Sequence, residues 1–147
     1  MGKANRKKQR RTNTGVTDMA TEQTMRRQMK NGEYAPALET LVKIIKQKKI
    51  KPEFLYDGAY AYFKLGDYER ATEWVNNTLT YAPGDIPARL LLAQICLLEH
   101  RIDESLAIFE FVLANGRDKL KSDDLNEILN CKCKLNKILT HNNSQLA

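Results

Sequence analysis

The residues with the most reactive side chains in this sequence are Cys131 and Cys133, two thiols separated by a single lysine. Two thiolates fill only half of the four positions that a structural zinc ion requires, and no histidine or second cysteine pair stands nearby. If this segment is helical, side chains two positions apart point about 200° away from each other. The pair therefore does not predict a metal site.

The other candidates for catalysis are isolated from one another. His100 and His141 lie far apart in the sequence, and neither belongs to a recognisable pattern of acid, base and nucleophile. Asp67, Glu69 and Glu73 fit the acids of a turn and a helix surface, and the sequence has no glycine-rich phosphate-binding motif. We therefore expect a protein that is not an enzyme and that uses no cofactor or metal.

Positive charge is concentrated at the N-terminal end of the sequence. Six basic residues and no acid fall within residues 1–12, namely Lys3, Arg6, Lys7, Lys8, Arg10 and Arg11. The other 18 of the 24 Lys and Arg residues match the 18 acidic residues, so residues 13–147 are formally neutral. A basic segment without aromatic residues suits contacts to nucleic-acid phosphates or another anionic surface better than base stacking, although a solvated extension has the same composition.

Membrane and secretory classes do not fit this composition. No apolar run approaches the roughly 18 residues that a membrane helix needs, and no apolar segment of a secretory signal follows the basic residues. The three cysteines are an odd number and do not suggest a disulfide framework. We expect a cytoplasmic protein without a membrane span.

A repeat of 34 residues organises most of the chain. Residues 32–37 (GEYAPA) recur as residues 66–71 (GDYERA), and the same offset leads to residues 100–105 (HRIDES). Matching apolar positions continue through the neighbouring segments, as in Leu41, Val75 and Phe109. A period of this length is typical of stacked helical hairpins, in which each unit buries its apolar face against the next.

The repeat resembles the tetratricopeptide repeat, whose pattern is W-x2-L-G-x2-Y, then A-x3-F, then P. Matches in the middle repeat are Ala59, Tyr62, Gly66, Tyr68, Ala71, Leu79 and Pro83. Gly58 departs from the pattern, because the family prefers a large aliphatic residue there. Gly32 and Gly66 fit a left-handed residue after the first helix of a pair, whereas the third repeat places His100 there, at a cost of about 1–2 kcal/mol.

This resemblance implies an all-α, right-handed α-α superhelix of three repeats, at about residues 18–51, 52–85 and 86–117. Helices are expected at about 18–31, 34–48, 53–65, 68–81, 86–99, 102–115 and 122–140. Asp85 fits a helix cap, and the last helix carries one apolar stripe that would cap the stack. The domain is thus expected to span 17–140, between unstructured segments at 1–16 and 141–147.

In tetratricopeptide proteins, the first helix of each pair lines a concave groove that receives a partner peptide or helix. Tyr56 and Tyr60, followed by Phe63, would form an aromatic ridge in that groove. The predicted partner-binding residues are Tyr56, Tyr60, Phe63, Lys64, Leu90, Gln94, Leu97, Arg26 and Met29. Inter-repeat packing is the competing interpretation for Phe63 and Leu97. An exposed apolar groove is also compatible with a homodimer.

The resemblance also argues against one ligand class. Tetratricopeptide co-chaperones hold acidic peptide C-termini with a clamp of Lys, Asn, Asn, Lys and Arg. The matching positions are Glu22, Arg26, Asp57, Pro87 and Leu91, of which only one is basic. We therefore predict a protein-binding adaptor or small chaperone with an aromatic, apolar groove. The alternative is an accessory factor of a nucleic-acid or ribosome assembly, docked through residues 1–12.

Overall fold

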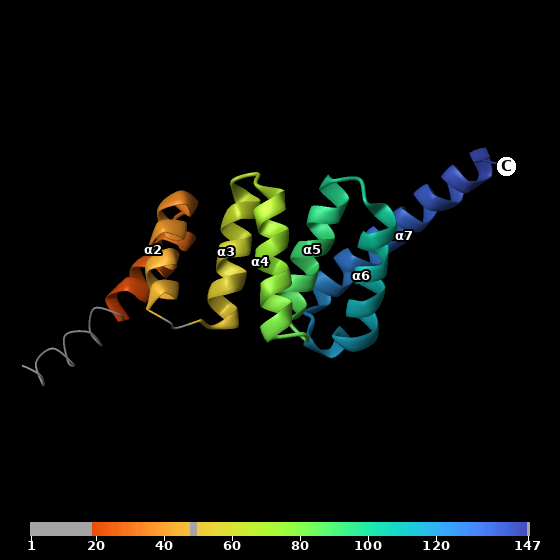
Figure 1. Ribbon diagram of the computed structural model, residues 1–147. Helices are drawn as coiled ribbons and strands as arrows, with labels where there is room; N and C mark the ends of the chain where they lie inside the picture. The colour runs from red at the N-terminus through yellow and green to blue at the C-terminus, as the bar shows by residue number, and fades with distance from the viewer. Residues whose placement is uncertain (1–18, 48–49, 147) are drawn as a thin grey trace, which may run out of the picture. The chain divides into compact units, whose positions relative to one another are not determined.

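Every regular element of residues 19–47 and 50–146, which are the residues described by the computed structural model, is a helix (Figure 1). Residues 19–30 form the first helix. The others are α2 (Tyr34–Lys46), α3 (Pro52–Lys64), α4 (Tyr68–Tyr81), α5 (Ile86–Leu98), α6 (Ile102–Asn115), the short 3-10 helix η1 (Arg117–Lys119) and α7 (Ser122–Leu146). The predicted all-α helical-repeat fold, three helix pairs followed by a final helix, is confirmed. The expectation for residues 1–16 lies outside the described residues.

The helices group into two compact units that meet within α4, between Trp74 and Val75. The first unit is built on a cluster of buried residues from its first three helices: Met25, Leu41, Ile44 and Phe54. The second unit is built on a cluster from α5, α6 and α7: Ile86, Ala93, Phe109, Val112, Ile128 and Leu135. Each unit therefore has an apolar core of its own.

The same turn joins the two helices of each pair. Gly32, Gly66 and His100 have φ angles of 76°, 80° and 59°, so all three are left-handed, as the sequence predicts for the two glycines. After each of them, a backbone N–H reaches back across the helix end, from Glu33 to the oxygen of Gln28 (2.9 Å), from Asp67 to Tyr62 (3.0 Å) and from Arg101 to Cys96 (2.8 Å). These bonds satisfy carbonyl groups that a helix end leaves unpaired.

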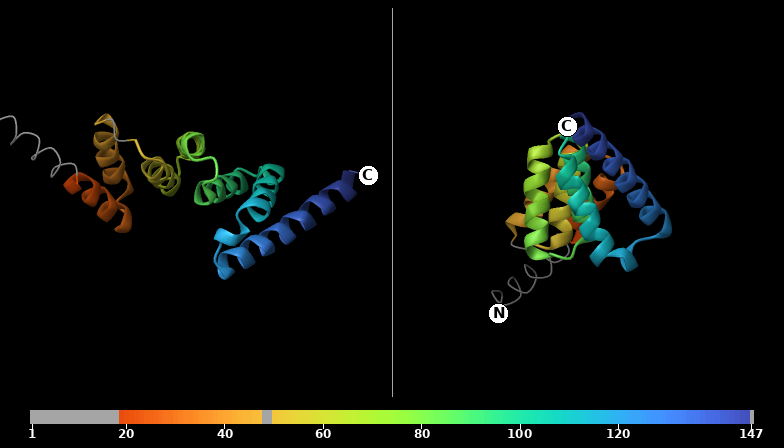
Figure 2. Two further views of the ribbon diagram at one scale, coloured as in Figure 1. Left: turned by 90° about the horizontal axis from the view of Figure 1, so that it is seen from below. Right: turned by 90° about the vertical axis from the view of Figure 1, so that its right-hand side faces the viewer.

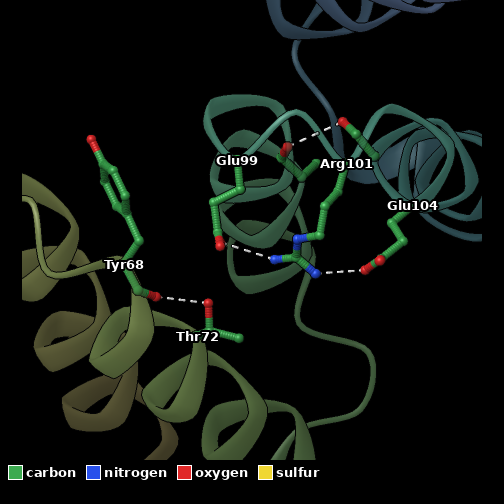
Figure 3. Close-up of polar contacts among 7 residues, drawn as sticks. Tyr68, Thr72, Glu99, Arg101 and Glu104 are labelled. Atoms are coloured by element: carbon green, nitrogen blue, oxygen red, sulfur yellow. Dashed lines mark hydrogen bonds and ion pairs between the residues drawn. The ribbon is translucent and has the colours of Figure 1, made fainter.

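Ion pairs surround the third turn, where glycine is missing. The Arg101 guanidinium donates to Glu99 at 3.0 Å and to Glu104 at 2.6 Å (Figure 3). Figure 3 also shows an ordinary helix contact in α4, in which the Thr72 hydroxyl donates to the Tyr68 carbonyl at 2.8 Å. The side chains of Glu99, Arg101 and Glu104 thus form ion pairs beside His100, whose backbone amide donates to the Leu97 carbonyl at 3.1 Å.

The starts of α4 and α5 carry side-chain caps, of which the cap at Asp85 was indicated by the sequence. The Asp85 carboxylate accepts a hydrogen bond from the Ala88 amide at 2.9 Å, and Pro87 lies in the first turn of α5. Asp67 accepts from the Arg70 amide at 3.1 Å at the start of α4. These contacts satisfy amides that the first helical turn leaves without a partner.

Small residues are buried where paired helices cross closely. Ala59 and Ala71 are fully buried, and so are Ala93 and Ser105 at the matching positions of the third repeat. The Ser105 hydroxyl donates to the Ala93 carbonyl at 3.1 Å, so serine adds a hydrogen bond between α5 and α6. A longer side chain at any of these positions would separate the pair of helices.

Gly58, which departs from the family pattern, leaves room for an indole. A Cβ atom at this position would lie 2.3 Å from the Trp74 ring and 3.0 Å from Leu41. Trp74 therefore occupies the volume that a large aliphatic side chain at position 58 would otherwise fill. The side-chain volume that the family places on α3 is here supplied by Trp74 of α4, so the two helices remain closely packed.

Helix α7 continues six residues beyond its predicted end. It runs to Leu146, and its C-terminal end extends past α6 (Figure 2). The prediction of an unstructured segment from residue 141 is thus wrong for residues 141–146, while residue 147 lies outside the described residues. No glycine or proline interrupts this stretch, and the Thr140 and Ser144 hydroxyls donate to carbonyls of the preceding turn at 2.8 Å. An Asn-rich composition alone does not end a helix.

Candidate partner-binding surface

Five aromatic side chains of the first unit form a continuous ladder, which we call the aromatic ridge: Tyr34, Tyr56, Tyr60, Phe63 and Tyr68. Tyr60 lies at its centre, with ring centroids 6.4 Å from Tyr56, 6.5 Å from Phe63 and 6.0 Å from Tyr34. Phe63 extends the ladder to Tyr68 at 5.8 Å. All five residues are partly exposed, so each ring that contacts a neighbour in the ridge also belongs to the surface of the protein.

The ridge follows from the local sequence of α3. Pro52 starts the helix in its first turn, after Lys51 in extended backbone, and the helix then places Tyr56, Tyr60 and Phe63 on one side. The Lys64 ammonium lies 5.5 Å from the centroid of Tyr60. The ring of Tyr60 attracts this cation, which adds a positive charge beside the centre of the aromatic ridge.

Two tyrosines of the ridge are absent from the predicted set of partner-binding residues. Tyr34 begins α2 and Tyr68 begins α4, and each packs edge-on or tilted against a ring of α3. Their spacing of 34 residues is visible in the sequence and identifies them as one repeat position. That signal fixes the repeat but does not by itself show which side of the helix pair a tyrosine covers.

Charged groups stand next to the ridge on α3. Arg26 approaches Glu53 at 3.9 Å, with both side chains largely exposed. One turn further on, Asp57 is partly buried, and burial raises the pKa of its carboxyl group from 3.8 to about 6. The positive charge of Arg26 opposes this rise in pKa, and the negative charge of Glu53 adds to it. A carboxyl group at position 57 would repel an acidic ligand at neutral pH.

Met29, another predicted partner-binding residue, packs mainly into the protein. Its half-buried side chain lies against the core cluster of the first unit, which includes Met25 and Phe54. Arg26, by contrast, is exposed and is available to a ligand as well as to Glu53. The structure therefore brings Arg26 close to Glu53 of α3 and leaves Met29 partly buried against the core cluster.

The predicted residues of the third repeat lie in the second unit. Leu90 and Leu97 are partly buried against its core cluster, whereas Gln94 is exposed. A cavity of about 260 Å³ opens between three helices of this unit and is lined by Leu90, Gln94, Leu97, Phe109, Asp124, Glu127, Ile128 and Cys131. Helix α7 was expected only to cap the stack of repeats, so its four lining residues were not predicted.

The three cysteines are free thiols that differ in exposure. Cys96 is fully buried, and burial raises the pKa of its thiol. Cys131 is half-buried and Cys133 is exposed, and neither forms a disulfide. Among residues 19–47 and 50–146, no group of three or more His, Cys, Asp or Glu side chains could hold a metal ion. In the same part of the chain, no helix is long and apolar enough to cross a membrane.

The paired helices, the left-handed turns and the small residues at the crossings together define a tetratricopeptide helical-repeat protein. Residues 30–112, more than half of the chain, match the family described as anaphase-promoting complex, cyclosome, subunit 3, and the chain belongs to this family. A curated relative is the TPR repeat-containing protein MJ1428 of Methanocaldococcus jannaschii, which is 29% identical over 98 residues, or 67% of this chain. The match spans only 17% of that relative.

Solved structures of the same fold confirm the architecture. The first TPR domain of Spaghetti (RPAP3), bound to the HSP90 peptide SRMEEVD, matches with a TM-score of 0.70 and 18% identity, covering 84% of this chain and 93% of that one. The Sgt2 TPR domain from Aspergillus fumigatus matches with a TM-score of 0.69 and 14% identity, covering 87% and 82%. At these identities the similarity concerns the fold.

Proposed function

We propose that this chain is a non-catalytic protein-binding module, an adaptor or small chaperone, that holds an apolar peptide or helix of a partner on the aromatic ridge. The single observation that carries this proposal is the continuous ladder of five partly exposed rings with Lys64 at Tyr60. Tyrosine and phenylalanine bury large contact areas with few rotatable bonds, and they dominate the energetics of many interfaces. The peptide bound to the Spaghetti domain of similar fold supports the same general mode of action.

The charges beside the ridge favour a partner that is not an acidic C-terminus. The peptide in the Spaghetti structure, SRMEEVD, ends in several carboxylates. Here Asp57 carries a carboxyl group of its own, Arg26 already approaches Glu53, and Leu91 at another clamp position is 3% exposed and belongs to the interior. We expect that SRMEEVD does not bind this chain measurably, whereas apolar peptides do.

Replacing Tyr56 and Tyr60 together by Ala tests the ridge. Peptides selected by the full chain from a random phage-displayed library are measured against the parent and the variant by fluorescence anisotropy. We expect apolar peptides and a loss of affinity of more than about tenfold in the variant, because two anchors of a hot spot are removed. Circular dichroism and thermal unfolding establish that the variant is folded.

A matched control removes two aromatic rings elsewhere. Tyr81 is 61% exposed and Phe111 is 39% exposed, and neither belongs to the ridge. The Tyr81→Ala/Phe111→Ala variant should bind the selected peptides as the parent does. Peptides that bind the Tyr56→Ala/Tyr60→Ala variant with the affinity of the parent would contradict the assignment of the ridge.

A further inference from the structure

The cavity in the second unit has the size of a pocket for one side chain. Its volume of about 260 Å³ lies below the roughly 300–1,000 Å³ of pockets that hold drug-sized molecules. Helices α5, α6 and α7 all contribute to its wall, so the cavity is formed by the packing of three helices. A pocket of this kind suits an anchoring side chain of a peptide.

The interior of the cavity is apolar. Phe109 and Ile128, each 5% exposed, line it together with the partly buried Leu90 and Leu97. Both leucines pack on the core cluster of the second unit, which fixes their positions. An apolar side chain entering the cavity would therefore exchange water for a preformed apolar surface.

The opening of the cavity is acidic. Asp124 and Glu127 follow each other at a spacing of three residues in α7, and both side chains are exposed. Neither takes part in an ion pair with the residues that the structure describes, and the lining includes no lysine or arginine. Two uncompensated negative charges beside an apolar cavity favour a ligand that combines an apolar side chain with a cation.

We propose that this cavity anchors an apolar side chain of a partner peptide and that Asp124 and Glu127 select a lysine or arginine next to that side chain. The site rests on the proposed protein-binding function and adds a second, separate contact whose charge preference is opposite to that of an acidic C-terminal peptide. Gln94 lies at the same cavity as an exposed amide that can hydrogen-bond the peptide backbone. Two exposed ion pairs of ordinary strength contribute roughly fivefold in affinity.

The test uses two blocked, fluorescent seven-residue peptides and the full chain. The basic probe has phenylalanine between lysine and arginine, with glycine and serine on either side, and its acidic counterpart has glutamate at both flanking positions. We expect the basic probe to bind at least five times more tightly than the acidic one. In the Asp124→Asn/Glu127→Gln variant this preference should fall to less than about twofold. Raising the salt concentration should weaken the basic probe in the parent more than in the variant.

A matched control removes two acids of the same unit that do not line the cavity. Asp118→Asn/Asp123→Asn changes the net charge by the same amount, and Asp123 shares the first turn of α7 with Asp124. The control should retain the full preference for the basic probe. Equal loss in the control and in the Asp124→Asn/Glu127→Gln variant would show a general effect of net charge and would overturn the proposal.

Cys131 provides a second measurement, because its half-buried thiol lines the cavity. In a Cys133→Ser background, where Cys96 is fully buried, the basic probe should slow the alkylation of Cys131 by at least threefold. A probe that binds without protecting Cys131, and that is lost in the Tyr56→Ala/Tyr60→Ala variant, sits on the aromatic ridge. That outcome would overturn the cavity and leave the proposed function intact. Equal binding of the acidic probe would also overturn the cavity.

Discussion

Asp57 is a residue whose surroundings conflict with its charge. It is partly buried on the same side of α3 as Tyr60, and Arg26 only partly offsets the cost of burying the carboxylate. The result is the rise of the pKa of Asp57 from 3.8 to about 6. A carboxyl group with a raised pKa is protonated more readily in the folded chain than in the unfolded chain, so folding is opposed once the group ionises.

The sign of the pH dependence follows from this pKa. Below about pH 3.8, Asp57 is protonated in both states and costs no stability, whereas between 3.8 and about 6 the folded state loses stability as the pH rises. Asp57→Asn should therefore raise the free energy of unfolding by about 1–2 kcal/mol at pH 7.5 and by less than about 0.5 kcal/mol at pH 4, after allowance for solvent screening. Urea unfolding at both pH values measures the difference. The exposed Asp118→Asn variant is the control, and an equal gain for Asp57→Asn at both pH values would refute this account.

The chain contains three turns between paired helices, and the left-handed position is glycine in two of them and histidine in the third. Gly32 and Gly66 adopt the left-handed conformation without steric cost, and His100 adopts it with a Cβ atom close to its own backbone. The backbone hydrogen bonds of the three turns are the same, with lengths of 2.8–3.0 Å across each helix end. The third turn therefore keeps its geometry through tertiary packing and local ion pairs against an unfavourable residue.

Changing that residue should stabilise the protein. His100→Gly removes about 1–2 kcal/mol of left-handed strain and adds about 0.5–1 kcal/mol of chain entropy to the unfolded state, so a net gain of roughly 0.5–1 kcal/mol is expected. Differential scanning calorimetry should show a Tm higher by about 1–4 °C. His100→Ala keeps the strain and should bring no gain. Gly66→Ala is the converse test and should cost about 1 kcal/mol of stability. An added Cβ atom would meet nothing within 4 Å, so the whole cost would come from the left-handed backbone conformation. If His100→Ala stabilised the protein equally, the imidazole side chain rather than the backbone conformation would be the source of the lost stability.

The bounds of the helices were predictable where single residues in the sequence mark the start or the end of a helix. Gly32 and Gly66 mark the ends of first helices and Asp85 marks the start of α5, so most predicted bounds agree with the structure within two residues. Contacts between helices were harder to predict from the sequence. The exchange of bulk between Gly58 and Trp74 depends on two residues of different helices whose relation no local pattern reveals.

The residues of the candidate binding surfaces were likewise predictable within one helix but not between helices. Tyr56, Tyr60 and Phe63 share one helix, and their contact follows from helical spacing. The addition of Tyr34 and Tyr68 to the ridge, and of Asp124 and Glu127 to the cavity, requires knowledge of how neighbouring helices rotate about their axes. Helical periodicity gives the apolar stripe of one helix, but the partner that covers each stripe is set by packing.

At the scale of the whole molecule, the excess of positive charge and the two proposed binding surfaces are separated along the chain. Residues 1–12 hold six basic residues, whereas residues 13–147 carry 18 basic and 18 acidic residues. The aromatic ridge and the acidic cavity both belong to the neutral part. Attraction to polyanions and binding of a partner peptide should therefore be separable by deletion, because one depends on net charge and the other on local apolar contacts.

Deleting residues 1–12 tests this separation and the alternative function in a nucleic-acid assembly. We expect the full chain to bind single-stranded RNA with an affinity that falls steeply with salt, since up to six phosphate contacts give a slope of log affinity against log salt of about −4. The shortened chain, which is formally neutral, should lose this binding and should keep the affinity of the parent for peptides selected on the ridge. Retention of RNA binding after the deletion would place the anion-binding residues elsewhere. Loss of peptide binding would show that electrostatic attraction, rather than the aromatic rings, brings the partner to this protein.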